Sequence, residues 1–424
     1  MNTTTRAMTL MFSLFLFGCS SDESFAAKTP PALPAAMTAL EFGPDATLFV
    51  ADPVRNVIHA IDVSDSLEGR AVTEPLAFNL TDFGEQLAAK LEVDEASLRY
   101  YDVAVHAQSQ VAFLSLGVQS GTGEEPYLAS ITLEGDIEIL GLDNTERSTT
   151  SLEAPPDAGI TFMRDVPAST LVVTDLDYSD GVLYVSGLST GEFASTLRQI
   201  PYPFGNDASR TSIEMFHAAH GQQETRAPIR AMTLVDIDGK KTIVAAYTCT
   251  PLVTIDVDDL EDGAHVNGKT IAELGYGNQP LDILSFDVYG MDGKAEPYVL
   301  VINRDMGAKL LSLSAIAESD SSPGLSAPVA GLGFTAGTEH MTVPLSGVVQ
   351  VADQNPQFLL ALKRNLERGT TELLSYRKGS YMRISEFQSE YNFPDYEYAE
   401  GQEFIRQFQN QLKADEGYTT RVRN

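Results

Sequence analysis

The densest cluster of polar side chains in the sequence is the segment FHAAHGQQETRAPIR. It contains His217 and His220, two of the six histidines of the chain. Histidines three residues apart can share a metal ion if the segment is helical, and imidazole nitrogen binds zinc, copper and iron. No HExxH motif accompanies them, so the alternative is a loop whose polar side chains bond to buried carbonyl groups. The candidate binding loop consists of His217, His220, Glu224, Arg226 and Arg230.

Cys249 is a second candidate metal ligand. It lies in AAYTCTP, which predicts an apolar strand that ends at a proline, and free cysteines are usually buried, so a core position is expected. In the alternative, Cys249 joins His217 and His220, or His340 and Met341, in a copper-like set of soft ligands. A nucleophilic cysteine would need an activating histidine and an electropositive pocket, and the sequence shows neither. No cofactor is assigned, and the candidate metals are calcium, zinc and copper.

The charge of the chain limits its partners. Acidic side chains outnumber basic ones by 59 to 28, and the formal net charge is −31. Nucleic acids and anionic lipid surfaces are bound through clustered Lys and Arg, so this charge argues against both. No GxSxG, P-loop or CxxCH sequence occurs, which removes the main support for those enzyme and cofactor classes. No catalytic residue is assigned, and a non-enzymatic role is favoured.

Short β-type segments fill the chain from Met37 onward and recur as six units, which start near residues 38, 101, 172, 230, 281 and 347. Each unit has an opening strand, a turn, a strongly apolar strand and a third, alternating strand. This order is typical of a propeller blade, which has an inner strand at the axis and progressively wetter outer strands. The sequence therefore predicts an all-β fold, a β-propeller of six or seven blades, with a β-sandwich as the second choice. Tight hairpins are expected at Asp180-Gly181, Asp238-Gly239 and Asp292-Gly293.

Two units resemble repeats of a known family. The segments LEFGPD, LFVAD and IHAID of the first unit, and DGVLYV of the third, are similar to repeats of NHL/YVTN-type β-propellers. The resemblance implies the fold and carries no chemistry. The family includes binding scaffolds, lactonases and subunits of redox complexes, so it leaves the activity open.

Carboxylates stand near the starts of five of the units. Because inner strands converge on the axis of a propeller, these side chains either chelate a cation there or face water. The candidate axial acids are Glu41, Asp102, Asp175, Glu224 and Asp282.

Two segments depart from the strand pattern. Phe83, Leu87 and Leu91 recur every four residues and predict a short helical insertion within 82–99. In a C-terminal helical extension and tail, 381–424, Phe404, Phe408 and Leu412 mark an amphipathic helix. That helix either caps the rim of the propeller, which is assigned to 37–380, or docks on a partner protein.

The N-terminus indicates export. An apolar run, AMTLMFSLFLFG, is too short to span a bilayer and is typical of a signal peptide. It ends in LFGC, which resembles the lipobox of bacterial lipoproteins. The resemblance implies a signal peptide at 1–18, lipid on Cys19, a tether at 19–36 and, with Ser20 next, anchoring in the outer membrane. An ordinary cleaved signal with an incidental cysteine is the alternative.

Three functions are compatible with these features. The first is a lipid-anchored binding or scaffold propeller, which faces the periplasm or the cell surface and binds a protein partner of the envelope or a small-molecule ligand. The second is a lactonase-like hydrolase that uses a divalent cation at the axis. The third is a redox accessory protein that uses His217, His220 and Cys249.

Overall fold

The computed structural model describes residues 32–418, except 73–74, 122, 291, 330, 332–333, 391–392 and 394. The expected signal peptide, the lipidation residue Cys19 and most of the expected tether lie outside the described residues. Within the described part, no helix is both long enough and apolar enough to cross a membrane.

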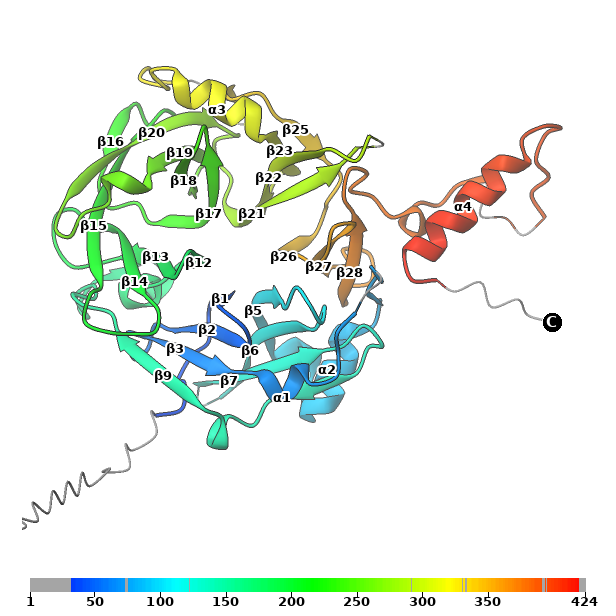
Figure 1. Ribbon diagram of the computed structural model, residues 1–424, viewed down its shortest axis with the longest axis horizontal. Coiled ribbons are helices and arrows are strands. Elements are labelled where there is room, and N and C mark those ends of the chain that lie inside the picture. Colours follow the sequence, from blue (N-terminus) through cyan, green and yellow to red (C-terminus); the bar gives the residue numbers. More distant parts are fainter. Residues whose placement is uncertain are drawn as a thin grey trace, which may run out of the picture. The chain divides into compact units, whose positions relative to one another are not determined.

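Six four-stranded antiparallel sheets form the blades of a β-propeller around a central axis (Figure 1). The first three blades, numbered by their inner strands, contain the following strands. Blade 1 has β1 (Leu40–Phe42), β2 (Thr47–Asp52), β3 (Val57–Asp62) and β9 (Arg147–Ser151); blade 2 has β5 (Leu98–Val105), β6 (Ala112–Ser120), β7 (Gly123–Ile131) and β8 (Ile137–Ile139); blade 3 has β12 (Asp175–Ser179), β13 (Val182–Leu188), β14 (Ser195–Pro201) and β15 (Ser209–His217).

The other three blades complete the ring, so the six starts expected from the sequence correspond to six blades. Blade 4 has β17 (Ile229–Ile237), β18 (Lys240–Tyr247), β19 (Pro251–Asp256) and β20 (His265–Glu273); blade 5 has β21 (Pro280–Tyr289), β22 (Ala295–Asn303), β23 (Ala308–Ser312) and β25 (Met341–Val343); blade 6 has β26 (Val348–Asp353), β27 (Phe358–Arg364), β28 (Thr371–Arg377) and β4 (Asn79–Leu80). Three short pairings lie outside the blades. Strand β10 (Thr161–Phe162) pairs with β11 (Val166–Pro167), β16 (Gln222–Glu224) pairs with β15, and β24 (Ala336–Gly337) pairs with β20.

The order of the blades around the axis differs from their order in the chain. Strand β1 lies between β5 and β12, and β5 also contacts β26, so the ring runs through blades 1, 3, 4, 5, 6 and 2. The chain makes three strands of blade 1, adds β4 to blade 6, forms blade 2, and returns with β9 to blade 1. Two blades are therefore closed by strands that are distant in sequence, which ties the ring together.

Blades 3 and 4 are joined at their outer edges. Strand β15 pairs in parallel with β20, with Ser212 opposite His265 and Met215 opposite Gly268. The two blades thus belong to one continuous sheet, and loops of blade 3 lie against loops of blade 4.

Local sequence explains most of the strands. The second strands are almost wholly apolar, and their side chains fill clusters between neighbouring blades, such as Leu114 with Leu360 and Val244 with Val299. Asp180-Gly181 and Asp238-Gly239 both have positive φ and form the expected two-residue hairpins. The loop at Asp292-Gly293 is longer, because β21 ends at Tyr289 and β22 begins at Ala295.

The helices lie outside the blades. Helix α2 (Phe83–Leu91) buries Phe83 and Leu87 beside β28, as their spacing predicts. The others are α1 (Ser64–Leu67), α3 (Leu313–Ser321) and α4 (Glu403–Asp415). Short 3₁₀ helices occur at Glu95–Ser97, Leu142–Asn144, Met163–Asp165, Ala168–Leu171, Val257–Asp259 and Ile384–Glu386.

Helix α4 matches the expected C-terminal helix. Its C-terminal end is attached to the propeller, since Asp415 lies 2.6 Å from Arg377 and the Glu416 carboxylate accepts hydrogen bonds from the backbone of Ile384 and Ser385. Phe404 and Phe408, however, are 63% and 58% exposed, so the apolar face of the helix is not covered by the described part of the chain.

Candidate functional site

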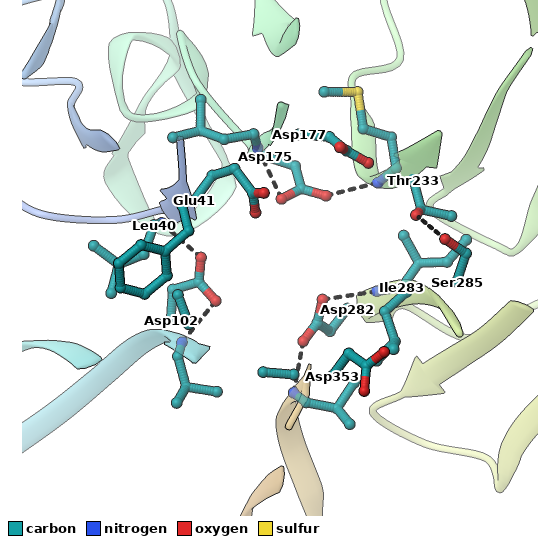
Figure 2. Close-up of a pocket in the computed structure, with 18 of the residues that line it drawn as sticks. Leu40, Glu41, Asp102, Asp175, Asp177, Thr233, Asp282, Ile283, Ser285 and Asp353 are labelled. Carbon is teal, nitrogen blue, oxygen red and sulfur yellow. Dashed lines mark hydrogen bonds between the residues drawn. The ribbon is translucent and has the colours of Figure 1, made fainter. Parts of the chain in front are cut away.

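All six inner strands contribute to a cavity of about 310 Å³ on the axis (Figure 2). Four of the five candidate axial acids line it, each from a different blade. The polar side chains around it are Glu41, Asp102, Asp175, Asp177, Thr233, Asp282, Ser285 and Asp353. We call its six carboxyl groups the acid collar. The fifth candidate, Glu224, is not among the lining residues.

Three members of the acid collar connect neighbouring blades. Asp102 accepts a hydrogen bond of 2.7 Å from the backbone of Leu40 in blade 1. Asp175 accepts a hydrogen bond of 2.6 Å from the backbone of Met232 in blade 4. Asp282 accepts one of 2.7 Å from the backbone of Val351 in blade 6. Bulges directly precede Asp102 and Asp282, and a bulge re-aims the side chains around it. These aspartates therefore have a structural role at the axis.

The surroundings of the acid collar disfavour the negatively charged form of its carboxyl groups. Burial raises the pKa of Asp102 to about 6 and that of Asp177 to about 7. Burial, and then the neighbouring carboxylates, raise the pKa of Asp175 and Glu41 well above their usual values. Among the described residues that line the cavity, none is Lys or Arg. The collar must therefore hold protons near neutral pH or attract a cation.

A larger cavity of about 1080 Å³ adjoins the first one, since Asp102, Asp175 and Asp282 line both cavities. We call the two together the axial channel. Arg230 and Arg304 line the larger cavity. Arg304 is satisfied by Asp305 and Gln279, at 2.9 and 3.0 Å, but the buried Nε of Arg230 has no hydrogen-bond partner in the described part of the chain.

The candidate binding loop divides between three places. Arg230 is the bulged residue of β17 at the axis, and Arg226 donates a hydrogen bond of 3.1 Å to the carbonyl of Glu192. His217, His220 and Glu224 come together at the outer edge of blade 3. Their segment is a β-hairpin of β15 and β16 and not the helix that a shared metal was expected to require.

The hairpin turn places the two imidazoles against each other. The backbone N–H groups of His220 and Gly221 both donate to the carbonyl of His217, and the ring centroids lie 3.8 Å apart. Glu224 approaches both Nδ1 atoms, at 3.0 Å for His217 and 2.5 Å for His220. Burial opposes the charge of Glu224, but the two histidines outweigh it and lower the pKa to about 2.

Cys249 lies beside this pair and not in the core, so the expected buried strand position is wrong. It is half-buried in the turn between β18 and β19, where its N–H donates 2.8 Å to the carbonyl of Asn278. One ligand atom each from His217, His220 and Cys249 lies within 4.8 Å of the others. His340 does not belong to this cluster in the described structure. The blade 3–blade 4 contact has thus brought Cys249 to two histidines that precede it by 29 and 32 positions in the sequence.

Sequence reasoning missed several residues of both sites. Asp177 follows Asp175 by two positions, and strand alternation would have placed both on one face. Glu273, at the end of β20, is fully buried near the histidine pair, next to the backbone of Ala219 and the side chain of Thr250. Burial raises its pKa to about 7, and nearby Glu224 adds to this rise. No local pattern signals Glu273, because its neighbours come from other strands.

No protein-family model and no curated protein matches this chain. Among solved structures, it is similar to the extracellular domains 1–2 of Drosophila Semaphorin 1a, with 8% identity, coverage of 81% of this chain and 86% of that chain, and a TM-score of 0.35. It is also similar to Trypanosoma rangeli sialidase, with 9% identity, coverage of 83% and 56%, and a TM-score of 0.35. A third is Cellvibrio cellulosa alpha-L-arabinanase, with 12% identity, coverage of 66% and 92%, and a TM-score of 0.27. The propeller fold stands on the blades described above, and no ligand or activity is transferred from these proteins.

Proposed function

We propose that this chain is a non-catalytic binding propeller, and that its axial channel takes a small ligand with an anionic group. The observation that carries the proposal is Arg230, whose Nε is buried without a partner in the described structure while the side chain lines the larger cavity. A buried guanidinium stays charged and is costly unless it is paired. A carboxylate or phosphate would supply that partner in the planar geometry that arginine favours.

The surroundings of Arg230 support an anion. Burial lowers the pKa of Arg230, the nearby Asp175 carboxylate raises it, and the charge of Arg304 lowers it again. Two arginines thus line the same cavity. The cavity of about 1080 Å³ is at the upper end of the range for small-molecule sites, about 300–1,000 Å³. A ligand larger than a free ion would therefore be needed to fill it.

The acid collar gives the proposal a pH dependence. Asp102 forms part of the cavity floor, and its pKa is raised by burial to about 6. As the pH falls from 8 to 5.5, the collar takes up protons while Arg230 remains charged. Anion binding should therefore tighten over this interval.

Isothermal titration of the full chain in detergent with citrate and with inorganic phosphate, at pH 6 and pH 8, tests the proposal. We expect binding at pH 6 that is at least tenfold weaker in Arg230→Gln and partly kept in Arg230→Lys. Arg226→Gln is the matched control, because this arginine of the same loop contacts a carbonyl outside the channel. Binding to neither anion, or equal affinity in Arg230→Gln, would refute the proposal.

A divalent cation in the acid collar is a second candidate, and Glu41 favours it. Figure 2 shows its carboxyl group next to that of Asp175, at the edge of the open space inside the collar, and burial, Asp177 and Asp175 raise its pKa. A cation there would support the hydrolase alternative. Calcium titration discriminates between the two candidates, since cation binding weakens as the pH falls and should be lost in Glu41→Gln.

We further propose that the propeller is held in the cell envelope through lipid on Cys19, as the lipobox resemblance implies, and that its kinship lies with the NHL/YVTN-type propellers. The exposed Phe404 and Phe408 of α4 support a protein partner at the C-terminal extension, because large apolar side chains gathered on an exposed helix face are typical of interaction sites.

A further inference from the structure

We propose that His217, His220 and Cys249 form a binding site for one zinc or copper ion at the junction of blades 3 and 4. This site is separate from the axial channel. Two imidazoles and a thiolate are the ligand types that borderline and soft ions such as zinc and copper prefer, whereas calcium and magnesium prefer oxygen.

The ligand atoms are close enough for a single ion. One atom from each residue lies within 4.8 Å of the other two. Metal–nitrogen and metal–sulfur bonds of about 2.0–2.3 Å place the ligand atoms of a tetrahedral site roughly 3.3–3.7 Å apart. The site therefore closes with side-chain shifts of about 1 Å, and the backbone can stay in place.

Glu224 prepares the histidines for this role. Its two oxygens lie 3.0 Å from Nδ1 of His217 and 2.5 Å from Nδ1 of His220. A carboxylate that accepts from Nδ1–H fixes the tautomer in which Nε2 carries a free lone pair. At His220, where the contact with Glu224 is a hydrogen bond, this leaves Nε2 available for a metal ion. At His217 the contact is an ion-pair distance, and neither ring nitrogen has a hydrogen-bond partner in the described part of the chain.

The site contains polar atoms that the protein itself does not satisfy. Nε2 of His217 is buried and has no hydrogen-bond partner in the described part of the chain. Buried polar groups are costly without partners, and a metal ion would satisfy the imidazole directly.

The backbone at Cys249 is strained. Cys249 and Thr250 have φ values of 68° and 69°, a region that is unfavourable for any residue with a side chain and most of all for a β-branched one. Such strain persists only where the surrounding structure imposes it, and it occurs often at functional sites. Here it directs the thiol out of the core and toward the histidine pair of the neighbouring blade.

Charge balance is also satisfied. A divalent ion, the Cys249 thiolate and the Glu224 carboxylate sum to zero. Metal binding requires the thiol to lose its proton, so binding should release protons and tighten with rising pH.

The test uses the full chain with Cys19→Ser, so that Cys249 is the single thiol, stripped of metal and titrated with Zn²⁺, Cu²⁺ and Co²⁺. Co²⁺ reports the ligands directly, because a thiolate–cobalt bond gives a near-ultraviolet charge-transfer band and tetrahedral geometry gives strong visible bands. We expect one equivalent of Zn²⁺ or Cu²⁺ per chain and a thiolate band with Co²⁺.

Variants locate the ion. Cys249→Ser should abolish the thiolate band, and both Cys249→Ser and His220→Ala should weaken Zn²⁺ binding at least 100-fold. Glu224→Gln should keep the band but lower the affinity about 10- to 100-fold, as expected for a positioning residue. His265→Ala is the matched control, since His265 is also a partly exposed histidine beside a glutamate, Glu214, at 3.3 Å.

Two results would contradict a metal site at His217, His220 and Cys249. If Cys249→Ser and His220→Ala bind Zn²⁺ as tightly as the parent chain, the ion sits elsewhere and the proposal is wrong. It is equally wrong if no thiolate band forms with Co²⁺. Because His220 is partly exposed, His220→Ala is expected to fold, and an unchanged unfolding midpoint of the metal-free variant verifies this. Loss of citrate binding in Arg230→Gln is independent of all these results, so the two proposals fail separately.

Discussion

The acid collar makes the propeller less stable as the pH rises, and Asp177→Asn isolates this effect. Burial raises the pKa of Asp177 from 3.8 to about 7 in the folded chain, while the unfolded chain has the ordinary value. The folded state therefore binds the extra proton between these two values. The stability that protonated Asp177 contributes is fully present below pH 3.8. It decreases as the pH rises and is lost above pH 7.

The magnitude follows from the pKa difference. Each pKa unit corresponds to about 1.36 kcal/mol, so the rise from 3.8 to about 7 amounts to about 4 kcal/mol for Asp177. Asparagine has the same shape, keeps an oxygen to accept the 2.7 Å hydrogen bond from Leu234, and carries no charge. Asp177→Asn should therefore stabilise the protein at pH 8 by up to about 4 kcal/mol and have little effect at pH 4.

Urea unfolding at pH 4, 5, 6, 7 and 8, in the absence of added metal, measures this difference. Asp207→Asn is the control, because Asp207 is an exposed aspartate of the same blade. A difference between Asp177→Asn and the parent chain that does not change with pH would refute the reasoning. So would an Asn variant that is less stable than the parent at pH 8.

Two further predictions concern closure and anchoring. Phe78 is fully buried before β4 and exchanges hydrogen bonds with Ser375, so Phe78→Ala should cost about 3–5 kcal/mol in urea unfolding, whereas Leu76→Ala, at a 47% exposed site, should cost less than about 0.5 kcal/mol. Equal losses would show that blade closure does not depend on this segment. Cys19→Ser should move the chain from the membrane fraction to the soluble fraction on cell fractionation, and a variant that stays in the membrane would contradict lipid anchoring.

The blades were predictable because their signals are local. The six starts, the hairpins at Asp180-Gly181 and Asp238-Gly239, and helix α2 follow from side-chain alternation, from residues that tolerate positive φ, and from four-residue spacing. The ring order was not predictable. Strands β4 and β9 are short and largely polar, and nothing in their sequences identifies the blade that each one joins.

The residues of the candidate sites also differ in whether the sequence could identify them. Four axial acids could be recognised because each stands at the start of a unit, and the inner strands of a propeller converge on its axis. Glu224 also stands near such a start, but it belongs to the β15–β16 hairpin and so serves the histidine pair.

The sequence by itself determined the strands, the turns and the chemical types of the candidate ligands, because these depend on neighbours a few residues away. Only the tertiary structure decided that Cys249 leaves the core and meets His217 and His220, and that the Nε atom of Arg230 is buried without a hydrogen-bond partner in the described structure. Both results depend on how blade 4 packs against its neighbours. That packing is set by the parallel pairing of β15 with β20 and by closure of the ring, which are contacts between segments far apart in the chain.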